Sequence, residues 1–231
     1  MKDNKFIVVM FISMILLGAV CGATFYFMFM FTGGVPIFHC ISVGIFFGLL
    51  NSFTVLFFIR KYSNIKLDNK ELERQMRIDN LTKLYNRYAF DSDIKNLTTE
   101  DQCSMIFIDI DNFRSFNNDY GHHSGDKVLT NCAEIIRRSV RLSDMVYRYG
   151  GEEIVIILER CSKAEAERIG WNIVESIRNF DNSPYPMITV SAGVATIPDD
   201  TASIDKLIKL SDLALLRAKK LGKNQVISSF E

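Results

Sequence analysis

The chain has no excess of charge of either sign, because its 231 residues include 27 basic and 27 acidic side chains. A protein that binds nucleic acid through a general basic surface carries a clear positive excess. The balance argues against that class of protein, although it leaves room for local basic patches. We therefore expect no nucleic-acid partner.

Two common sequence signatures are also missing. No G-x-x-x-x-G-K-[ST] motif occurs, so the chain has no P-loop nucleotide site. No C-x-x-C pair occurs either, and the adjacent His122 and His123 lie in a loop-like stretch without zinc spacing. We interpret the five cysteines as free thiols in a reducing compartment: Cys21, Cys40, Cys103, Cys132 and Cys161.

Charge is absent from two long apolar runs, residues 6–31 and 37–59. Each exceeds the roughly 20 apolar residues that a helix needs to cross a bilayer. The turn residues "TGGVP" at 32–36 separate the runs, so we predict an all-α transmembrane hairpin over residues 1–59. The alternative, a cleaved signal peptide, fits poorly because the first run is too long and lacks a clear cleavage site.

Basic residues flank this hairpin on both sides. By the positive-inside tendency, both ends are expected in the cytoplasm. The residues concerned are Lys2 and Lys5 before the first run, and Arg60, Lys61 and Lys66 after the second.

Residues 60–78 are highly charged and lack Gly and Pro, which predicts a helical linker. Ile65, Leu72 and Met76 fall on one face of that helix, but Asn69 interrupts the seam. A short coiled coil between two subunits and a solvated helix are equally compatible with this pattern.

Residues 79–231 alternate between patterns typical of helices and of strands. This alternation predicts an α+β domain with a mixed or mainly antiparallel central sheet and helices packed on it. Strands are expected at 105–110, 187–196 and 225–228, a hairpin at 144–157, and helices at 128–140, 169–180 and 204–218.

The hairpin "DMVYRYGGEEIVII" contains Gly150 and Gly151 between two apolar-rich runs. Glycine adopts the positive φ of two-residue turns, so we predict a tight turn at this pair. Glu152 and Glu153 follow at once, and their side chains should face opposite sides of the sheet because directions alternate along a strand.

A partner for one glutamate is expected at the end of the central strand, where Asp109 and Asp111 emerge. Carboxylates there are costly unless solvated, paired or bound to a cation. If the hairpin lies beside this strand, Asp109 and either Glu152 or Glu153 can converge on a hard cation, and oxygen ligands suit Mg²⁺. The acids by themselves are equally compatible with separate surface charges.

Other polar segments have two interpretations each. The stretch "FNNDYGHHSGD" at 116–126 predicts a loop that can present polar groups to the edge of a base, although Asp126 could instead cap the following helix. The lysines of "RAKKLGKN" at 217–224 either favour the dipole at a helix end or hold phosphates.

Five ordered motifs together resemble the GGDEF family of diguanylate cyclases. They are "DNLTKLYNR" (79–87), "DIDNFRSFNNDYGHHSGD" (109–126), "RLSDMVYRYGGEE" (141–153), "VSAGVA" (190–195) and "SDLALLRAKKLGKN" (211–224). The resemblance implies a domain over 79–231 with a five-stranded sheet surrounded by helices, related to the palm of polymerases. It also implies an enzyme of a bacterial cytoplasmic membrane that joins two GTP molecules into cyclic di-GMP, as a homodimer with the catalytic domain in the cytoplasm.

Residue roles follow from the same resemblance. Asp109 and Glu152 would bind Mg²⁺, with Mn²⁺ as an alternative, through side chains, and Ile110 would bind it through its carbonyl; Glu153 would assist at the metal and the attacking 3′-hydroxyl. The remaining implied contacts are Asn117 and Asp126 on guanine, Arg114, Lys219 and Lys223 on phosphates, Gly150 and Gly151 beside the nucleotide, and Arg141 and Asp144 as an R-x-x-D site for inhibitory product.

The chain departs from the family pattern at three positions. Arg114 replaces a usual lysine, Lys223 a frequent arginine and Ile154 a common phenylalanine. None of these removes a metal ligand or a guanine contact. A catalytically inactive domain that binds GTP or cyclic di-GMP and regulates a partner is the alternative, disfavoured because all the signature acids are present.

Overall fold

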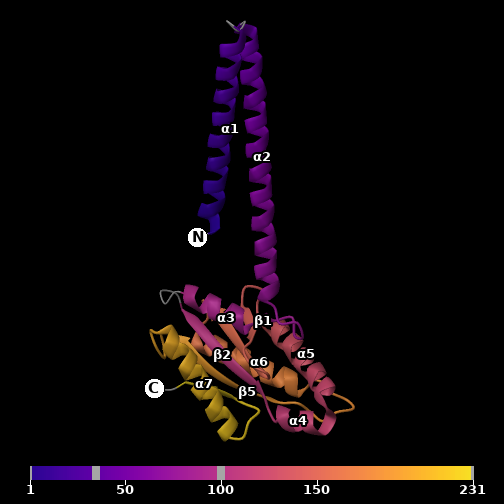
Figure 1. Ribbon diagram of the computed structural model, residues 1–231. Coiled ribbons are helices and arrows are strands. Elements are labelled where there is room, and N and C mark those ends of the chain that lie inside the picture. The colour runs from indigo at the N-terminus through magenta and orange to yellow at the C-terminus, as the bar shows by residue number, and fades with distance from the viewer. Residues whose placement is uncertain (1, 33–36, 98–101, 230–231) are drawn as a thin grey trace. The chain divides into compact units, whose positions relative to one another are not determined.

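The computed structural model describes residues 2–32, 37–97 and 102–229. The chain divides into two compact units, residues 1–73 and 74–231, and each has its own internal contacts (Figure 1). Most of the turn predicted at 32–36 falls outside the described residues.

The first unit is made of helix α1 (Lys2–Thr32) and most of helix α2 (Ile37–Met76). By length and composition, Ile12–Phe31 and Gly44–Leu67 could each cross a membrane. Helix α2 continues without a break to Met76, so the charged linker is one helix with the second apolar run. The side chains of residues 68–75 lie outside the description, which leaves the seam through Asn69 and Leu72 a prediction.

The second unit is built on a six-stranded mixed sheet in the order β1-β3-β4-β2-β5-β6. The four central strands are antiparallel, and the edge strands β1 and β6 pair in parallel. The predicted mixed sheet is therefore confirmed, with a sixth strand of two residues added at one edge. The strands are β1 (Tyr85–Asn86), β2 (Cys103–Ile110), β3 (Met145–Arg148), β4 (Glu153–Glu159), β5 (Val190–Ile197) and β6 (Val226–Ser228).

Helices cover both faces of this sheet, so all eight residues of β2 are buried. Ile106, Ile108 and Ile110 pack toward α4, α5 and α6, whereas Met105 and Phe107 pack toward α3 and α7. Figure 1 shows α7, in yellow, along the sheet beside β5. The helices are α3 (Arg87–Asp93), α4 (Phe113–Tyr120), α5 (His122–Ser139), α6 (Lys163–Arg178) and α7 (Ile204–Lys220), with a 3-10 turn, η1, at Ile94–Asn96.

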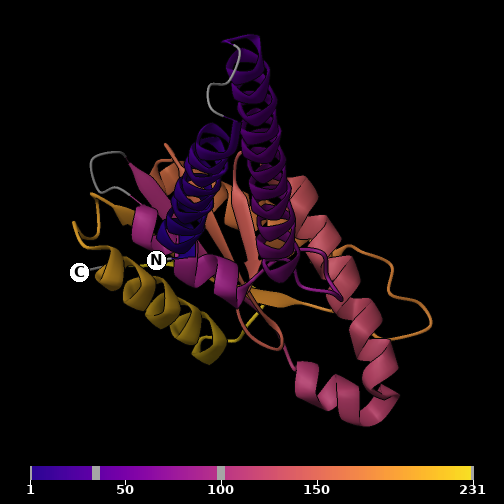
Figure 2. The same cartoon turned by 45° about the horizontal axis from the view of Figure 1, so that its top comes forward.

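The segment 116–126, predicted as a loop, is helical on both sides of Gly121. Helix α4 ends and α5 begins there, with Gly121 at φ 81°, and the two pink helices meet at a sharp angle in Figure 2. His122 and His123 therefore lie in the first turn of α5 and not in a loop. Gly121 occupies the N-cap position and Asp126 lies inside the helix, so the capping role considered for Asp126 is wrong.

The hairpin turn is longer than predicted. Residues 149–152 join β3 to β4, and the amides of Tyr149 and Gly150 both donate to Glu153 O, at 2.8 and 3.3 Å. Neither Gly150 nor Gly151 has a positive φ, so the two-residue turn is wrong. An added Cβ at residue 150 would lie 2.3 Å from Glu153 Oε2, so a larger residue there would displace the Glu153 carboxylate.

Helix α7 approaches β5 closely at Gly193. An added Cβ there would lie 2.1 Å from the Leu215 amide nitrogen and 2.2 Å from Ser211 O. The helix backbone can reach the sheet at this point only because residue 193 has no side chain. This contact fixes α7 over the central strands.

Candidate functional site

Asp109 and Glu153 are direct cross-strand partners at one end of the sheet. Asp109 is the penultimate residue of β2, Glu153 is the first residue of β4, and their Cα atoms are paired in the antiparallel ladder. Opposite residues of such a pair point their side chains to the same face. Here that face is the one covered by α7, so the sequence expectation that the hairpin lies beside the strand-end aspartate is confirmed.

Helix α7 brings a cation to this acidic pair. Lys219 Nζ lies 2.7 Å from Asp109 Oδ2, and the Asp109 side chain is 9% exposed. Burial raises the pKa of Asp109 above its ordinary value, and the charge of Asp111 adds to the rise, while Lys219 and Lys223 oppose it. The carboxylate therefore needs positive charge beside it to remain ionised at little cost.

The charged form of Glu153 is disfavoured in a similar way. Burial raises its pKa, the neighbouring Asp109 carboxylate raises it further, and Lys219 lowers it. Glu152 precedes it in the turn and adds a smaller repulsion. Two acids whose charged forms are disfavoured side by side make a site that gains from binding a cation.

The backbone adds an oxygen at the same place. The Asp111 amide donates to Thr189 O at 2.9 Å, on the β5 side of β2. In a trans peptide the preceding carbonyl points the opposite way, so Ile110 O is directed toward the β4 side. The β2–β4 ladder ends at Asp109 and Glu153, which leaves this carbonyl beyond the last paired residue.

This donor set consists of carboxylate and carbonyl oxygens, which suits Mg²⁺. Among the described residues no three acidic, His or Cys side chains surround one point, so a bound ion would complete its shell with carbonyl, water or substrate oxygens. Asp111 is a poorer candidate ligand, because its carboxylate already accepts three hydrogen bonds from the protein. The residues present therefore fit a cation that is shared with phosphates.

The other predicted phosphate contacts lie around this end of the sheet. Lys223, just after α7, donates from Nζ to Asn112 Oδ1 at 2.6 Å. Asn112 follows β2 and precedes α4, so this bond joins the two segments. Arg114 is exposed in the first turn of α4. The structure thus brings Lys219 and Lys223 to the end of β2, and gives no bound partner to Arg114 among the described residues.

Asn117 faces the start of α5 across a glycine. Its Oδ1 is buried without a hydrogen-bond partner among the described residues, and an added Cβ at Gly125 would lie 1.8 Å from that oxygen. Asp126 is exposed one residue further on. A buried acceptor beside an exposed carboxylate matches the N–H donors on the edge of guanine.

Arg148 is a site residue that the sequence reasoning did not identify. Its Nε and Nη2 donate to Gly151 O in the turn, and its Nη1 donates to Asp79 Oδ1 at 3.1 Å. Asp79 also accepts from the Thr82 amide and hydroxyl. Burial opposes ionisation of Asp79, but the Thr82 donors and the Arg148 charge outweigh it and lower its pKa. The signal available in the sequence was an arginine two residues before the Gly-Gly pair.

The R-x-x-D segment forms a compact turn. The Arg141 amide donates to Asp144 Oδ2 at 2.8 Å, and the Arg141 guanidinium lies 2.5 Å from Glu165 Oε1. Arg137, which the sequence reasoning also missed, donates to the carbonyl oxygens of Arg141, Leu142 and Asp144. Asp144 is buried and shapes the turn, whereas the Arg141 side chain is exposed.

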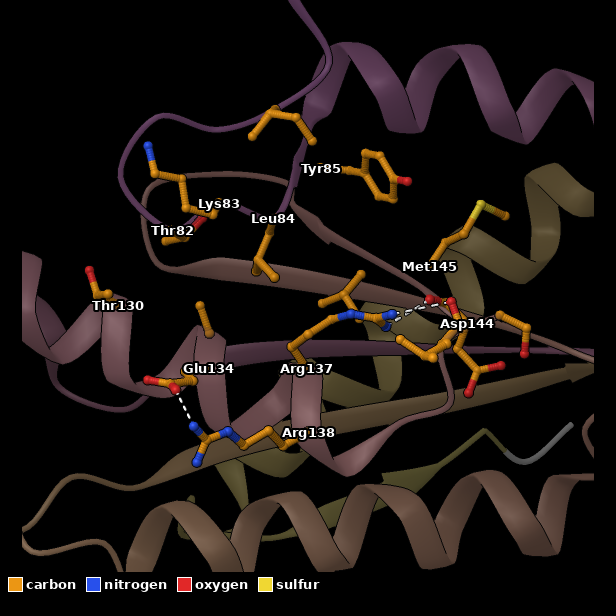
Figure 3. Close-up of a pocket in the computed structure, with 15 residues that line it drawn as sticks. Thr82, Lys83, Leu84, Tyr85, Thr130, Glu134, Arg137, Arg138, Asp144 and Met145 are labelled. Atoms are coloured by element: carbon orange, nitrogen blue, oxygen red, sulfur yellow. Dashed lines mark hydrogen bonds and ion pairs between the residues drawn. The ribbon is translucent and has the colours of Figure 1, made fainter. Parts of the chain in front are cut away.

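Two cavities lie on either side of this turn, away from the acidic pair. The larger, of about 790 Å³, lies between residues 78–85, α5 and residues 142–146, and Figure 3 shows Arg137 directed across it to Asp144. The smaller, of about 200 Å³, includes Arg141, Glu165 and Arg168. Arg141, the arginine of the R-x-x-D segment, lines the smaller cavity.

Comparison with known proteins decides the family. The family model described as "Diguanylate cyclase, GGDEF domain" matches residues 76–225. The chain belongs to the GGDEF family of diguanylate cyclases. The GGDEF fold predicted from the sequence is confirmed by solved structures.

Individual relatives agree with this assignment. Diguanylate cyclase DgcM of Escherichia coli K12 is 36% identical over 165 residues, which are 69% of this chain and 40% of the relative. The chain spans 51% of the uncharacterized protein YhcK of Bacillus subtilis, at 34% identity over 75% of its own length. It therefore covers about half or less of these curated relatives.

Solved structures that contain GGDEF domains resemble this chain. The coiled coil and GGDEF domain of DgcB from Caulobacter crescentus, in complex with c-di-GMP, gives a TM-score of 0.67 at 26% identity, over 74% of this chain and 95% of that chain. The active GGEEF domain of a diguanylate cyclase from Vibrio cholerae gives 0.54 at 29% identity, over 63% of this chain and 92% of that chain. Residues 150–153 of the present chain are likewise Gly-Gly-Glu-Glu.

Proposed function

We propose that this GGDEF protein is an active diguanylate cyclase that converts two GTP into cyclic di-GMP and two pyrophosphates. The observation that carries the proposal is the Asp109–Glu153 pair at the end of β2, with Lys219 of α7 against it. In each of two equivalent steps a 3′-hydroxyl loses its proton and attacks an α-phosphorus, a phosphodiester bond forms, and pyrophosphate leaves.

Asp109, Ile110 O and Glu152 would hold Mg²⁺, with Mn²⁺ as an alternative. The bound ion would neutralise charge on the phosphoryl oxygens and on the leaving pyrophosphate. Glu153 lies across from Asp109, and its raised pKa suits a group that accepts the proton of the 3′-hydroxyl. Lys219 would exchange its contact with Asp109 for a phosphate when the nucleotide binds.

The remaining contacts select and hold the nucleotide. Asn117 and Asp126 would bind the guanine edge, and the buried Asn117 oxygen supports this because it lacks another donor among the described residues. Arg114 and Lys223 would bind phosphates with Lys219. The turn through Gly150 and Gly151 would lie beside the nucleotide, where an added Cβ at Gly151 would meet nothing within 4 Å.

Each domain would bind one GTP, so two copies must face each other for the product to form, and the active enzyme would be a homodimer. Helices α1 and α2 would anchor it in the cytoplasmic membrane of a bacterium, as a two-span protein with both ends in the cytoplasm. Tethering raises the effective concentration of one copy near another. Cyclic di-GMP would inhibit by binding at Arg141 and Asp144, with the 200 Å³ cavity beside Arg141 as support.

Product analysis of the full chain in detergent micelles tests the proposal. With GTP and Mg²⁺, mass spectrometry should detect cyclic di-GMP from the wild type and from the control Asp199→Asn, an exposed carboxylate beyond the far end of β5. Asp109→Asn should form none. A wild type that binds GTP but makes no product would replace the cyclase with the alternative, a nucleotide-binding regulator.

A further inference from the structure

Asp111 is a buried carboxylate that the proposed reaction does not use. It is 5% exposed and lies one residue beyond β2. Its Oδ1 accepts from Ser191 Oγ at 2.7 Å, and its Oδ2 accepts from Thr189 Oγ1 at 2.8 Å and from the Asn224 amide at 3.0 Å. Thr189 directly precedes β5 and Ser191 is its second residue, whereas Asn224 follows α7, so this side chain joins the end of β2 to two other segments.

The loop that it holds is conformationally strained. Gly222, Lys223 and Asn224 all have positive φ, at 121°, 66° and 46°. Glycine adopts such values freely and asparagine tolerates them, but a lysine there costs about 1 to 2 kcal/mol. A conformation of this kind persists only where surrounding contacts fix it. The bond from the Asn224 amide to Asp111 is one such contact, adjacent to Lys223.

The position of Lys223 depends on the same loop. With φ at 66°, its side chain reaches Asn112, the residue next to Asp111 in the chain. Lys223 is thereby held at the end of β2, close to the segment that carries Asp109 and Ile110. If the Asn224 amide lost its acceptor, the loop would relax toward negative φ and the Lys223 side chain would leave this place.

We propose that Asp111 is a positioning residue for the nucleotide: its carboxylate fixes the 222–224 loop so that Lys223 is directed at the triphosphate. It acts through Lys223 and not as a metal ligand: its oxygens bind three protein donors, one of which is the Asn224 amide of the loop itself. The effect of Asp111 on GTP turnover rests on the proposed function. Its effect on the 222–224 loop does not.

The variants separate this role from metal binding. Asp111→Ala removes all three bonds. Asp111→Asn keeps an oxygen for Thr189 and Asn224, and its amide nitrogen can donate to the Ser191 hydroxyl, which turns to accept. If Asp111 positions the loop, Asp111→Asn should therefore keep its function and Asp111→Ala should lose it. If Asp111 were a metal ligand, both variants should lose function. Thr189→Val, which removes one donor and keeps the shape, should give an intermediate effect.

Steady-state kinetics of the full chain in detergent micelles, at saturating Mg²⁺, supply the first test. Asp111→Ala should raise KM for GTP about tenfold, as expected for the loss of one charge-assisted contact, with a smaller change in kcat. Lys223→Ala should do the same. The double variant should be no worse than the poorer single one, because both changes remove one interaction. Asp111→Asn should stay within about twofold of wild type.

A further measurement keeps the outcome independent of turnover. Hydrogen exchange of the Asn224 amide should accelerate at least about tenfold in Asp111→Ala and stay near wild type in Asp111→Asn. The matched control is Asp181→Ala, since Asp181 likewise accepts from the amide and hydroxyl of Ser183 but lies on the surface. This control should leave GTP binding and Asn224 exchange unchanged.

Three results would overturn the inference: unchanged Asn224 exchange in Asp111→Ala, an Asp111→Asn variant as impaired as Asp111→Ala, or independent effects that multiply in the double variant. A wild type that binds a non-hydrolysable GTP analogue without turnover would instead refute the proposed cyclase. In that case the same comparison, made on the affinity for the analogue, would still decide the role of Asp111.

Discussion

Arg148 donates two hydrogen bonds to the carbonyl oxygen of Gly151, from Nε at 3.1 Å and from Nη2 at 2.8 Å. The third nitrogen of the same guanidinium reaches Asp79, which follows the end of α2 at Met76 by three residues. One planar side chain therefore fixes the signature turn against the segment that leaves the linker helix.

This fork predicts that Arg148→Lys is not a conservative change. An ammonium group can keep the charge beside Asp79 but cannot at the same time reproduce the two bonds that converge on Gly151 O, so the turn carrying Glu152 should lose its fixed position. We expect kcat for cyclic di-GMP formation to fall at least about tenfold, with the domain still folded. Arg138→Lys is the control, because Arg138 is 77% exposed and pairs with Glu134 on the surface of α5. Equal kcat values for the two variants would contradict this role.

The Asp109–Glu153 pair predicts a stabilising substitution. The pKa of Glu153 is raised, so the folded state disfavours its charge, and this cost appears as pH rises above the ordinary carboxyl range. Glu153→Gln should increase the free energy of unfolding by about 0.5 kcal/mol at pH 7, since like charges opposite each other in a sheet destabilise it. The gain should disappear near pH 4, where the wild-type carboxyls take up protons.

Thermal unfolding of the second unit, followed by near-UV circular dichroism at both pH values, measures this difference. Glu159→Gln is the control at the other end of β4, where the cross-strand partner is Cys103 and not an acid. It should change the stability little at either pH. A Glu153→Gln variant that is less stable than wild type at pH 7 would disprove the repulsion.

Gly125 predicts a loss of nucleotide binding without a loss of folding. An alanine at this helical position favours the helix by up to about 1 kcal/mol, but its Cβ would occupy the place of the Asn117 amide oxygen. Gly125→Ala should therefore weaken GTP binding about tenfold or more, the value of one lost hydrogen bond to a buried group. Isothermal titration with a non-hydrolysable GTP analogue measures the affinity.

Gly170→Ala is the matched control for this substitution. It also lies inside a helix, α6, and its added Cβ would approach the side chains of Val226, at 3.2 Å, and Val194, at 3.9 Å, and no residue of the proposed site. The analogue should bind it as it binds wild type. If Gly125→Ala bound the analogue equally well, Asn117 would have no part in recognising the base.

The ion pair between Arg141 and Glu165 predicts two opposite effects on product inhibition. Arg141→Ala should abolish inhibition by added cyclic di-GMP, because the outward guanidinium is the group that can contact its phosphates or stack on its bases. Glu165→Gln should strengthen inhibition several-fold, since it frees Arg141 from a competing carboxylate. Initial rates at increasing cyclic di-GMP give both inhibition constants, and unchanged inhibition in Arg141→Ala would exclude this site.

Periodicity predicted most of the domain because its elements bury regular patterns. The apolar run of β2 and the amphipathic stripes of α5, α6 and α7 are where the sequence placed them. Helix α4 was missed because only Phe113 and Phe116 are buried among its eight residues, and the rest are polar. Gly121, which ends one helix and begins the next, was the overlooked signal.

The site was predicted in part for a similar reason. Acid type and spacing placed Asp109 and the signature glutamates together, but only the strand register shows that Glu153 is the residue opposite Asp109. The turn geometry depends on Arg148 and on contacts distant in sequence, and a local Gly-Gly rule does not include them. Strand β1 was not expected either, because a strand of two residues has no periodic pattern and depends on contacts distant in sequence.

The two edges of the sheet have a consequence for how copies of the protein can meet. Strands β1 and β6 have only two and three residues, so each edge offers a neighbouring chain very few free amides and carbonyls. Such short edges disfavour a continuous sheet between two copies. A pairing of two copies would then rest mainly on side chains, which suits the separable encounter that the proposed reaction requires.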